Sequence, residues 1–181
     1  MKRVQDGNEF FLPFVDWKTE CMIHHQPFDY EVLASDIELS ADDAQLLQQA
    51  RMITEQSYAP YSLFHVGAAA RLVNGKTITG TNQENASYPV SICAERVLLS
   101  ALASLYPGVA VTTMAISYRH LKGRSQHPIS PCGMCRQALV EHQFHFRQAI
   151  RLILSGQEGQ VIVIQDAATL LPLGFSANDM R

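Results

Sequence analysis

Three cysteines and one glutamate are the residues of this chain best suited to chemistry. Cys93 and Glu95 are separated by one residue, and Cys132 and Cys135 form a Cys-x-x-Cys pair further along the sequence. Thiolates at such spacings are typical zinc ligands, and three protein ligands leave one coordination position open for water. A hydrolytic zinc also needs a separate group that moves protons. Glu95 is the candidate for that role, so these four residues predict an open zinc site.

Each half of this pattern also has a simpler interpretation. Cys132 and Cys135 alone would suit a redox pair or half of a structural zinc knuckle. Glu95 alone would suit a carboxylate that the dipole of a helix start stabilises. The combination of Cys93 and Glu95 with the later cysteine pair favours the catalytic interpretation.

The cysteines precede two segments with a helical pattern. Apolar residues recur at helical spacing from Ala94 to Leu105 and from Cys135 to Phe144. We therefore expect the N-termini of two helices to face one metal ion. The positive ends of the helix dipoles, with the guanidinium of Arg96 or Arg136, would offset the negative charge that three thiolates place around Zn²⁺.

Helices and strands are expected to alternate along the rest of the chain. Ser40 is typical of an N-cap, and Pro60 follows the end of a helix predicted to about Tyr58. Strands are predicted at 64–73, 77–81, 111–118, 150–155 and 161–165, with a hairpin turn at 74–76 and a short helix near residue 167. This order predicts an α/β domain of three layers, α/β/α, around a mixed sheet.

Composition limits the classes of protein to which the chain can belong. With 181 residues, of which 47% are hydrophobic, it fits one domain and leaves no room for a second catalytic domain. Its net charge of −3, without a Lys/Arg cluster, argues against nucleic-acid binding. No apolar run approaches the roughly 20 residues of a membrane helix, and the stretch from Phe10 to Val15 is too short for a signal peptide. Four cysteines suit reduced, metal-binding thiols, so we expect a cytoplasmic protein.

Several segments together resemble the small, three-cysteine type of the cytidine deaminase family. The Cys-x-Glu and Pro-Cys-x-x-Cys patterns are those of the zinc deaminases. Further segments resemble the family in the family's order: Tyr61–Ala69, Asn82–Pro89, Ser130–Gly133 and Leu170–Pro172 with Phe175. The resemblance implies a cytidine deaminase-like fold with a mixed five-stranded sheet. It covers residues 40–181 as the deaminase domain and leaves residues 1–39 as an amino-terminal extension.

The resemblance also implies a cofactor and a reaction. One Zn²⁺ per chain would be held by Cys93, Cys132 and Cys135 and would activate water. Glu95 would move protons while water adds to C4 of cytidine or 2′-deoxycytidine. The products would be ammonia and uridine or 2′-deoxyuridine, a reaction of pyrimidine salvage.

Residues around the substrate are assigned by the same resemblance. Asn82 and Glu84 would hold the ribose hydroxyls, where an amide and a carboxylate suit the task. Phe64 would border the pyrimidine ring, and the backbone N–H of Ala94 would donate to its O2. Arg96 would contact the thiolate ligands from behind.

Assembly is a further implication of the resemblance. Small three-cysteine members of the family are homotetramers, in which aromatic residues matching Tyr88 and Phe175 enter a neighbour's active site. The alternative is that both aromatic side chains pack within their own chain. The sequence shows no periodicity that decides between the two.

Two segments depart from the family pattern. The segment 119–128 is longer and more basic than the equivalent loop of compact members, which leaves the substrate scope open. The segment 1–39 is additional and contains Cys21, which we expect to be a passive thiol rather than a fourth ligand. It is too rich in aromatic residues for a solvated tail, so we expect it to pack on the domain or on a neighbour. These aromatic residues are Phe10, Phe11, Phe14, Trp17 and Phe28.

Three alternatives to cytidine deamination start from the same zinc motif. Enzymes acting on blasticidin S share that motif but lack the Asn-x-Glu-Asn-Ala segment, which is present here at 82–86. A deaminase of bases within RNA or DNA should show stacking aromatic side chains and positive charge along a groove, unlike this acidic chain. A non-enzymatic, zinc-stabilised interaction protein would not require Glu95.

Overall fold

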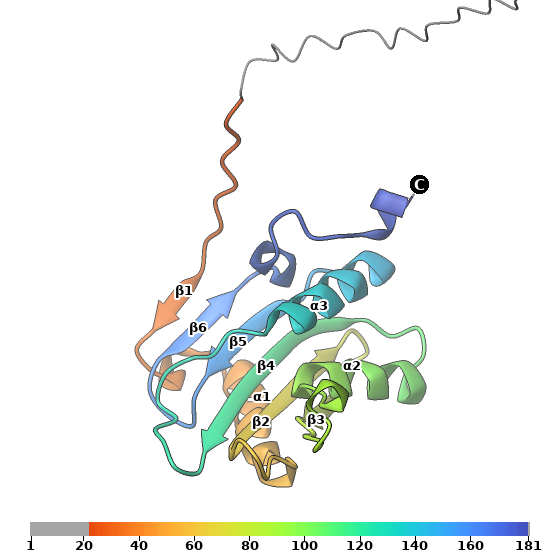
Figure 1. Cartoon of the computed structure of the whole chain (residues 1–181). Coiled ribbons are helices and arrows are strands. Elements are labelled where there is room, and N and C mark those ends of the chain that lie inside the picture. Colours follow the sequence, from red (N-terminus) through yellow and green to blue (C-terminus); the bar gives the residue numbers. More distant parts are fainter. Residues whose placement is uncertain (1–21, 181) are drawn as a thin grey trace, which may run out of the picture.

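A six-stranded sheet carries helices on both faces in the computed structural model, which describes residues 22–180 (Figure 1). The strands are β1 (Glu31–Leu33), β2 (Phe64–Leu72), β3 (Thr77–Thr81), β4 (Val111–His120), β5 (Arg151–Ser155) and β6 (Val161–Ile164). The α-helices are α1 (Ala41–Ile53), α2 (Ala94–Leu105) and α3 (Gly133–Phe146). Short 3-10 helices lie at Asp36–Glu38, Thr54–Gln56, Tyr88–Val90, Ala167–Leu170 and Ala177–Met180. Among these described helices, none is long and apolar enough to cross a membrane.

The sheet is mixed, as predicted, with the strand order β1-β6-β5-β4-β2-β3. β4 and β5 are parallel, and the other neighbouring strands are antiparallel. The predicted three-layer architecture is confirmed, but the predicted count of five strands is wrong. The sixth strand, β1, has three residues and pairs with the open edge of β6, so it is too short to show an alternating pattern in the sequence.

β1 belongs to the segment predicted to be an amino-terminal extension. Glu31 pairs with Val163 and Leu33 with Val161, so residues 31–33 contact the sheet directly. Phe28 precedes this strand, is 42% exposed and stacks on the ring of Tyr30 at 5.4 Å between centroids. The other aromatic residues named in the extension, and Cys21, lie outside the described residues: Phe10, Phe11, Phe14 and Trp17.

Alternating strand residues build two separate cores. Ala68 and Leu152 lie in the larger core with Leu98 of α2, whereas their neighbours Ala69 and Ile153 lie in the core beneath α1. Figure 1 shows α2 and α3 in front of the sheet and α1 behind it. Because side chains alternate between the faces of a strand, the strands β2, β4, β5 and β6 contribute to both cores. This double burial explains why the strands are so rich in apolar residues.

Two glycines let helices approach the sheet closely. A Cβ at Gly67 would lie 2.2 Å from the carbonyl oxygen of Ala50 in α1. A Cβ at Gly80 would lie 2.7 Å from the carbonyl oxygen of Ala94, the first residue of α2. The start of α2 therefore rests directly on β3, which holds its N-terminus at a fixed place.

Candidate active site

The three predicted zinc ligands lie together between the starts of α2 and α3. The sulfur of Cys132 is 3.7 Å from that of Cys93 and 3.5 Å from that of Cys135. All three sulfurs lie within 4.8 Å of one another. Sulfurs bound at about 2.3 Å to one tetrahedral zinc lie roughly 3.8 Å apart. The cluster therefore fits one zinc ion per chain.

The side chains of the two cysteines at the helix starts make no capping hydrogen bond. Cys93 and Cys132 occupy the N-cap positions of α2 and α3 with extended backbones, and neither side chain accepts a capping hydrogen bond. Their sulfurs are therefore left for a metal, while the N–H groups of both first turns lie nearby. The positive ends of two helix dipoles favour thiolates over thiols at this place.

The thiols of the cluster differ in acidity. Hydrogen bonding from Cys135, assisted by Cys132 and the charge of Arg96, lowers the pKa of the Cys93 thiol to about 6 in spite of its burial. The same hydrogen bond with Cys93 raises the pKa of Cys135, because Cys135 keeps the proton that the two sulfurs share. A thiolate at Cys93 therefore forms readily and offers a first ligand to an incoming cation.

Glu95 stands in the first turn of α2 beside the sulfur cluster. Only 4% of the residue is exposed, and burial raises the pKa of its carboxyl, with a further contribution from the charge of Cys93. A carboxyl with a raised pKa holds its proton more tightly than an exposed one. Such a carboxyl is suited both to accept and to return a proton, as an acid/base group must.

One pocket of about 490 Å³ opens beside these groups. Its size is typical of small-molecule sites. Cys93, Glu95 and Cys132 form part of its wall, and the predicted substrate residues in the wall are Phe64, Asn82, Glu84 and Tyr88. The other lining residues are Ser62, Val66, Gln83, Ser91, Ile92, Ile129, Ser130 and Met134. The structure thus joins the zinc motif and the Asn-x-Glu segment at a single cavity.

Phe64, at the start of β2, is supported from behind by aromatic side chains. Its ring stacks on that of Tyr118 at 4.7 Å between centroids with 20° between the planes. His127 in turn contacts Tyr118, with its Nδ1 3.1 Å from the phenolic oxygen. Sequence reasoning missed both supporting residues, because they lie far from Phe64 in the chain and Tyr118 is typical of a buried strand.

The Asn82 side chain forms three hydrogen bonds within the protein. Its Oδ1 accepts from the N–H of Val66 at 2.7 Å and from the hydroxyl of Ser57 at 2.7 Å. Its Nδ2 donates to the carbonyl of Phe64 at 2.9 Å. One N–H of the amide is left for a ligand. Asn82 therefore holds the start of β2 in place in addition to facing the pocket.

The two carboxylate oxygens of Glu84 differ in their hydrogen bonding, since only Oε2 accepts from backbone N–H groups. Its Oε2 accepts from the N–H groups of Tyr61 at 2.9 Å and Ser62 at 3.3 Å. Burial raises the pKa of Glu84, but hydrogen bonds from the Ser62 hydroxyl and these two amides outweigh it, so the net pKa is lowered. The carboxylate is therefore ionised at neutral pH. Its Oε1 has no protein partner among the described residues and can accept from a ligand hydroxyl.

Ala94 and Arg96 flank Glu95 at the start of α2. The N–H of Ala94 is one of the first-turn donors that have no partner inside the helix. Arg96 places its Nη1 3.9 Å from the sulfur of Met134, which lies between Cys132 and Cys135 in the sequence. The predicted contact of Arg96 with bound thiolates remains a prediction.

The two aromatic residues predicted to serve a neighbouring subunit are both on the surface. Tyr88 lines the pocket, is 70% exposed and meets the ring of Tyr61 edge-on at 5.9 Å. Phe175 is 57% exposed, and its carbonyl accepts a hydrogen bond from Gln137 at 2.8 Å. Phe175 does not line the pocket of its own chain as far as residues 22–180 show.

Arg136 fixes the segment that leads into the cysteine pair. Its Nε donates to the carbonyl of Pro131 at 2.8 Å, and Nη2 donates to the hydroxyl of Ser130 at 3.1 Å. Nη1 donates to the carbonyl of Leu170 at 3.0 Å. Sequence reasoning considered Arg136 only as a source of positive charge. Its position one residue after Cys135 was a usable signal, but its partner at Leu170 was not visible in the sequence.

The comparisons with known proteins agree with the class that this site defines, a zinc-dependent hydrolase. A family model described as "Cytidine and deoxycytidylate deaminase zinc-binding region" matches residues 40–149. A cytidine deaminase of Halalkalibacterium halodurans is 35% identical over 140 residues, which cover 77% of this chain and 98% of the relative. The crystal structure of cytidine deaminase from Burkholderia pseudomallei has a TM-score of 0.62 at 39% identity and covers 72% of this chain and 97% of that one.

A Blasticidin-S deaminase of Bacillus cereus is also similar, at 29% identity over 106 residues, which cover 58% of this chain and 75% of the relative. The match to the family model and the identity to the Halalkalibacterium enzyme are decisive at this coverage. The chain belongs to the cytidine and deoxycytidylate deaminase family. The resemblance found in the sequence is thereby confirmed.

Proposed function

We propose that this protein is a zinc-dependent hydrolase that deaminates cytidine and 2′-deoxycytidine, with release of ammonia. The observation that carries the proposal is the shared wall of one pocket, where Cys93, Cys132 and Glu95 meet Phe64. Relatives that are named cytidine deaminases support the choice of substrate. The Asn-x-Glu-Asn-Ala segment at 82–86 supports a nucleoside over blasticidin S.

Cys93, Cys132 and Cys135 would hold the zinc ion, which when bound supplies Lewis-acid activation of water. Glu95 accepts a proton from the attacking water and gives it to N3 of the pyrimidine. It then takes the second proton from the hydroxyl added at C4 and gives it to the departing amino group, which leaves as ammonia. The buried carboxyl suits both directions of transfer, because its pKa is raised.

The other residues orient the nucleoside. The ring of Phe64, fixed by its stack on Tyr118, packs along the pyrimidine. The N–H of Ala94 donates to the pyrimidine O2, and Glu84 accepts from a ribose hydroxyl through its available oxygen. These contacts keep C4 beside Glu95 during proton transfer.

The direct test is a spectrophotometric assay of purified, zinc-loaded protein with cytidine, 2′-deoxycytidine, cytosine and blasticidin S. We expect turnover of both nucleosides with release of ammonia. Turnover of blasticidin S without turnover of cytidine would favour the first alternative. Stoichiometric zinc without turnover of any of the four compounds would favour a zinc-stabilised interaction protein.

The ribose contacts predict a specific pattern of losses. Glu84→Ala should lower kcat/KM for cytidine by roughly 10- to 100-fold, the cost of one hydrogen bond to a charged group. Free cytosine should be a poor substrate of the parent, and Glu84→Ala should hardly change its kcat/KM. Asn82→Ala should impair both compounds, because Asn82 also holds the start of β2. Comparable kcat/KM for cytosine and cytidine in the parent would rule out the ribose assignment.

A homotetramer with shared active sites is the second part of the proposal. Tyr88 and Phe175 are exposed aromatic residues in the part of the chain that the structure describes. A groove of about 560 Å³ lies between α2 and α3, lined in part by Leu99, Ala103 and Phe146. A groove with apolar side chains in its wall supports association with further copies of the chain.

Mixed assemblies test this sharing. Phe175→Ala should strongly impair turnover if Phe175 completes a neighbour's site, and Glu95→Ala should be inactive. In mixed oligomers, a site can combine the intact Glu95 of one chain with the intact Phe175 of another. We expect co-expressed variants to be more active than the sum of the separate variants. Mixed oligomers without such recovery would contradict shared sites and leave the zinc chemistry of each chain unaffected.

Three further predictions belong to the proposal. Zinc-binding thiols persist in a reducing compartment, which supports a cytoplasmic location. The family model begins at residue 40, which supports a deaminase domain at 40–181 preceded by an extension at 1–39. The net charge of −3 supports a small-molecule substrate without a nucleic-acid partner.

A further inference from the structure

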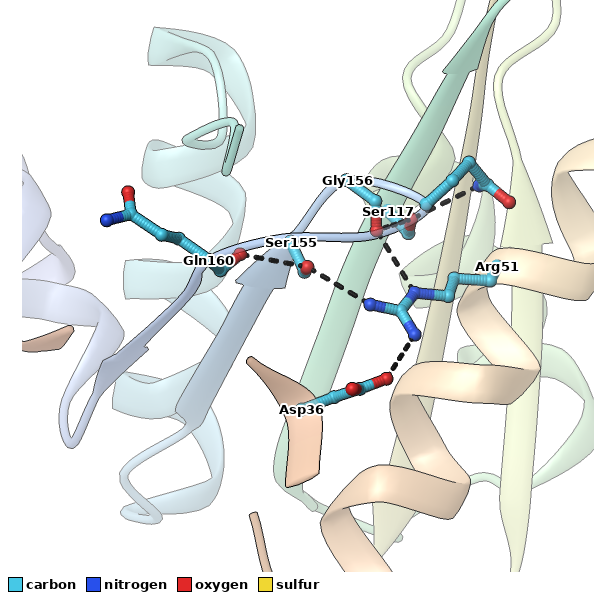
Figure 2. Close-up of polar contacts among 7 residues, drawn as sticks. Asp36, Arg51, Ser117, Ser155, Gly156 and Gln160 are labelled. Carbon is cyan, nitrogen blue, oxygen red and sulfur yellow. Dashed lines mark hydrogen bonds and ion pairs between the residues drawn. The ribbon is translucent and has the colours of Figure 1, made fainter. Parts of the chain in front are cut away.

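Arg51 is the centre of a polar network on the α1 side of the sheet (Figure 2). The residue is 9% exposed and forms an ion pair with Asp36, which precedes α1. Its Nε donates to the carbonyl of Gly156 at 3.0 Å, and its Nη2 donates to the hydroxyl of Ser155 at 3.3 Å. The Gly156 carbonyl also accepts from the hydroxyl of Ser117 at 3.0 Å. Arg51 thus ties the segment before α1 to the turn between β5 and β6.

The turn between β5 and β6 holds the loop at residues 121–130, which leads to the active site. The N–H of Gln157 donates to the carbonyl of Ser125 at 2.7 Å. Nε2 of Gln126 donates to the carboxylate of Glu158 at 2.7 Å. The fit is tight, because a Cβ at Gly156 would lie 2.0 Å from the Ser125 carbonyl oxygen. A displacement of the turn would therefore displace the loop.

The loop forms part of the pocket beside the zinc motif. Ile129 and Ser130 line the pocket, and His127 contacts the Tyr118 side chain that supports Phe64. The turn also reaches Tyr118 directly, since Nε2 of Gln157 donates to its carbonyl at 3.1 Å. Two sides of the pocket wall therefore depend on the position of the turn.

We infer that Asp36 and Arg51 are positioning residues that hold this pocket wall in the conformation that binds substrate. Without the Asp36 carboxylate, the guanidinium of Arg51 loses its charged partner and its fixed orientation. Its donors to Gly156 and Ser155 are then weakened, and the turn and the loop relax. The inference rests on the proposed function only for the identity of the substrate. It gives the segment before α1 a role in substrate binding.

Asp36→Ala tests the inference, with Asp43→Ala as the matched control. Asp43 lies on α1 and is also a carboxylate paired with arginine, at 2.7 Å from Arg151 and 3.5 Å from Arg71. It has no hydrogen bond to the turn or the loop. Asp36→Ala should raise KM for cytidine by about three- to tenfold with kcat within about twofold and zinc content unchanged. Asp43→Ala should lower the melting temperature and leave KM unchanged. An unchanged KM in folded Asp36→Ala would overturn the inference.

Gly156→Ala disturbs the same connection from its other end. It should raise KM, and the double variant with Asp36→Ala should raise KM by less than the product of the two single effects. The double variant of Gly156→Ala with Asp43→Ala should raise KM by the product of the two single effects. If Asp36→Ala and Gly156→Ala together raised KM by the full product of their single effects, the two substitutions would act independently, which would count against the inference.

Amide hydrogen exchange of peptides covering 121–130 measures the connection without turnover. Asp36→Ala should exchange faster there than the parent, whereas Asp43→Ala should match the parent. A parent that does not deaminate cytidine would refute the proposed function, while the exchange rates would still decide on the connection. Equal exchange in Asp36→Ala and the parent would refute the connection alone.

Discussion

Glu95→Gln is expected to lower kcat for cytidine by roughly 10²- to 10⁴-fold while zinc and fold are retained. Glutamine has nearly the same shape as glutamate, so the buried position beside Cys93 should accept it without a cavity. An amide cannot accept the proton of water or return one to the leaving amino group. The measurements are kcat, the zinc content per chain and the melting temperature of the variant.

Glu55→Gln is the control for this loss. Glu55 is an exposed carboxylate whose only ion pair among the described residues is a 3.5 Å contact with Arg119. Its removal should leave kcat unchanged, because exposed pairs at such distances contribute little. A zinc-loaded Glu95→Gln variant with a rate near that of the parent would refute the role of Glu95 in proton transfer.

Cys132→Ala is expected to reduce zinc from about one ion per chain to nearly none and to remove turnover. Cys132 is exposed, so loss of its sulfur leaves no core cavity, and the effect reports on the metal. Two thiolates hold zinc far more weakly than three, and zinc that binds only the folded state stabilises it. Metal analysis and a melting curve with and without a chelator measure both effects. The parent should melt at a lower temperature with chelator, whereas the variant should hardly respond.

Cys21→Ser is the control for the ligand set. It should retain zinc, turnover and the response to chelator, because three sulfurs already cluster without Cys21. Loss of zinc in Cys21→Ser would indicate a closed, four-ligand site. Full zinc in Cys132→Ala would show that the ligand set is wrong.

Local sequence patterns determined the elements of this protein and the identity of its chemical groups. Cys93 and Cys132 precede long apolar patterns, and the helices begin one residue after each of them. Such starts depend on neighbours within one turn, so they can be predicted without the fold. Strand positions agree for the same reason, since alternation and turn residues are local. β1 was not predicted, because its three residues form a strand only by pairing with β6.

Tertiary structure decided which distant groups meet. No local pattern shows that Asn82 is bound to Phe64 and Val66, or that the ring of Phe64 rests on Tyr118. Arg51 is the clearest case, because its partners at Asp36 and Gly156 lie on opposite sides of it in the chain. Hydrogen bonds and packing depend on distances in space, which separation along the chain does not encode. The sequence by itself therefore predicted which groups make up the proposed active site, and the fold decided how the walls of its pocket are held.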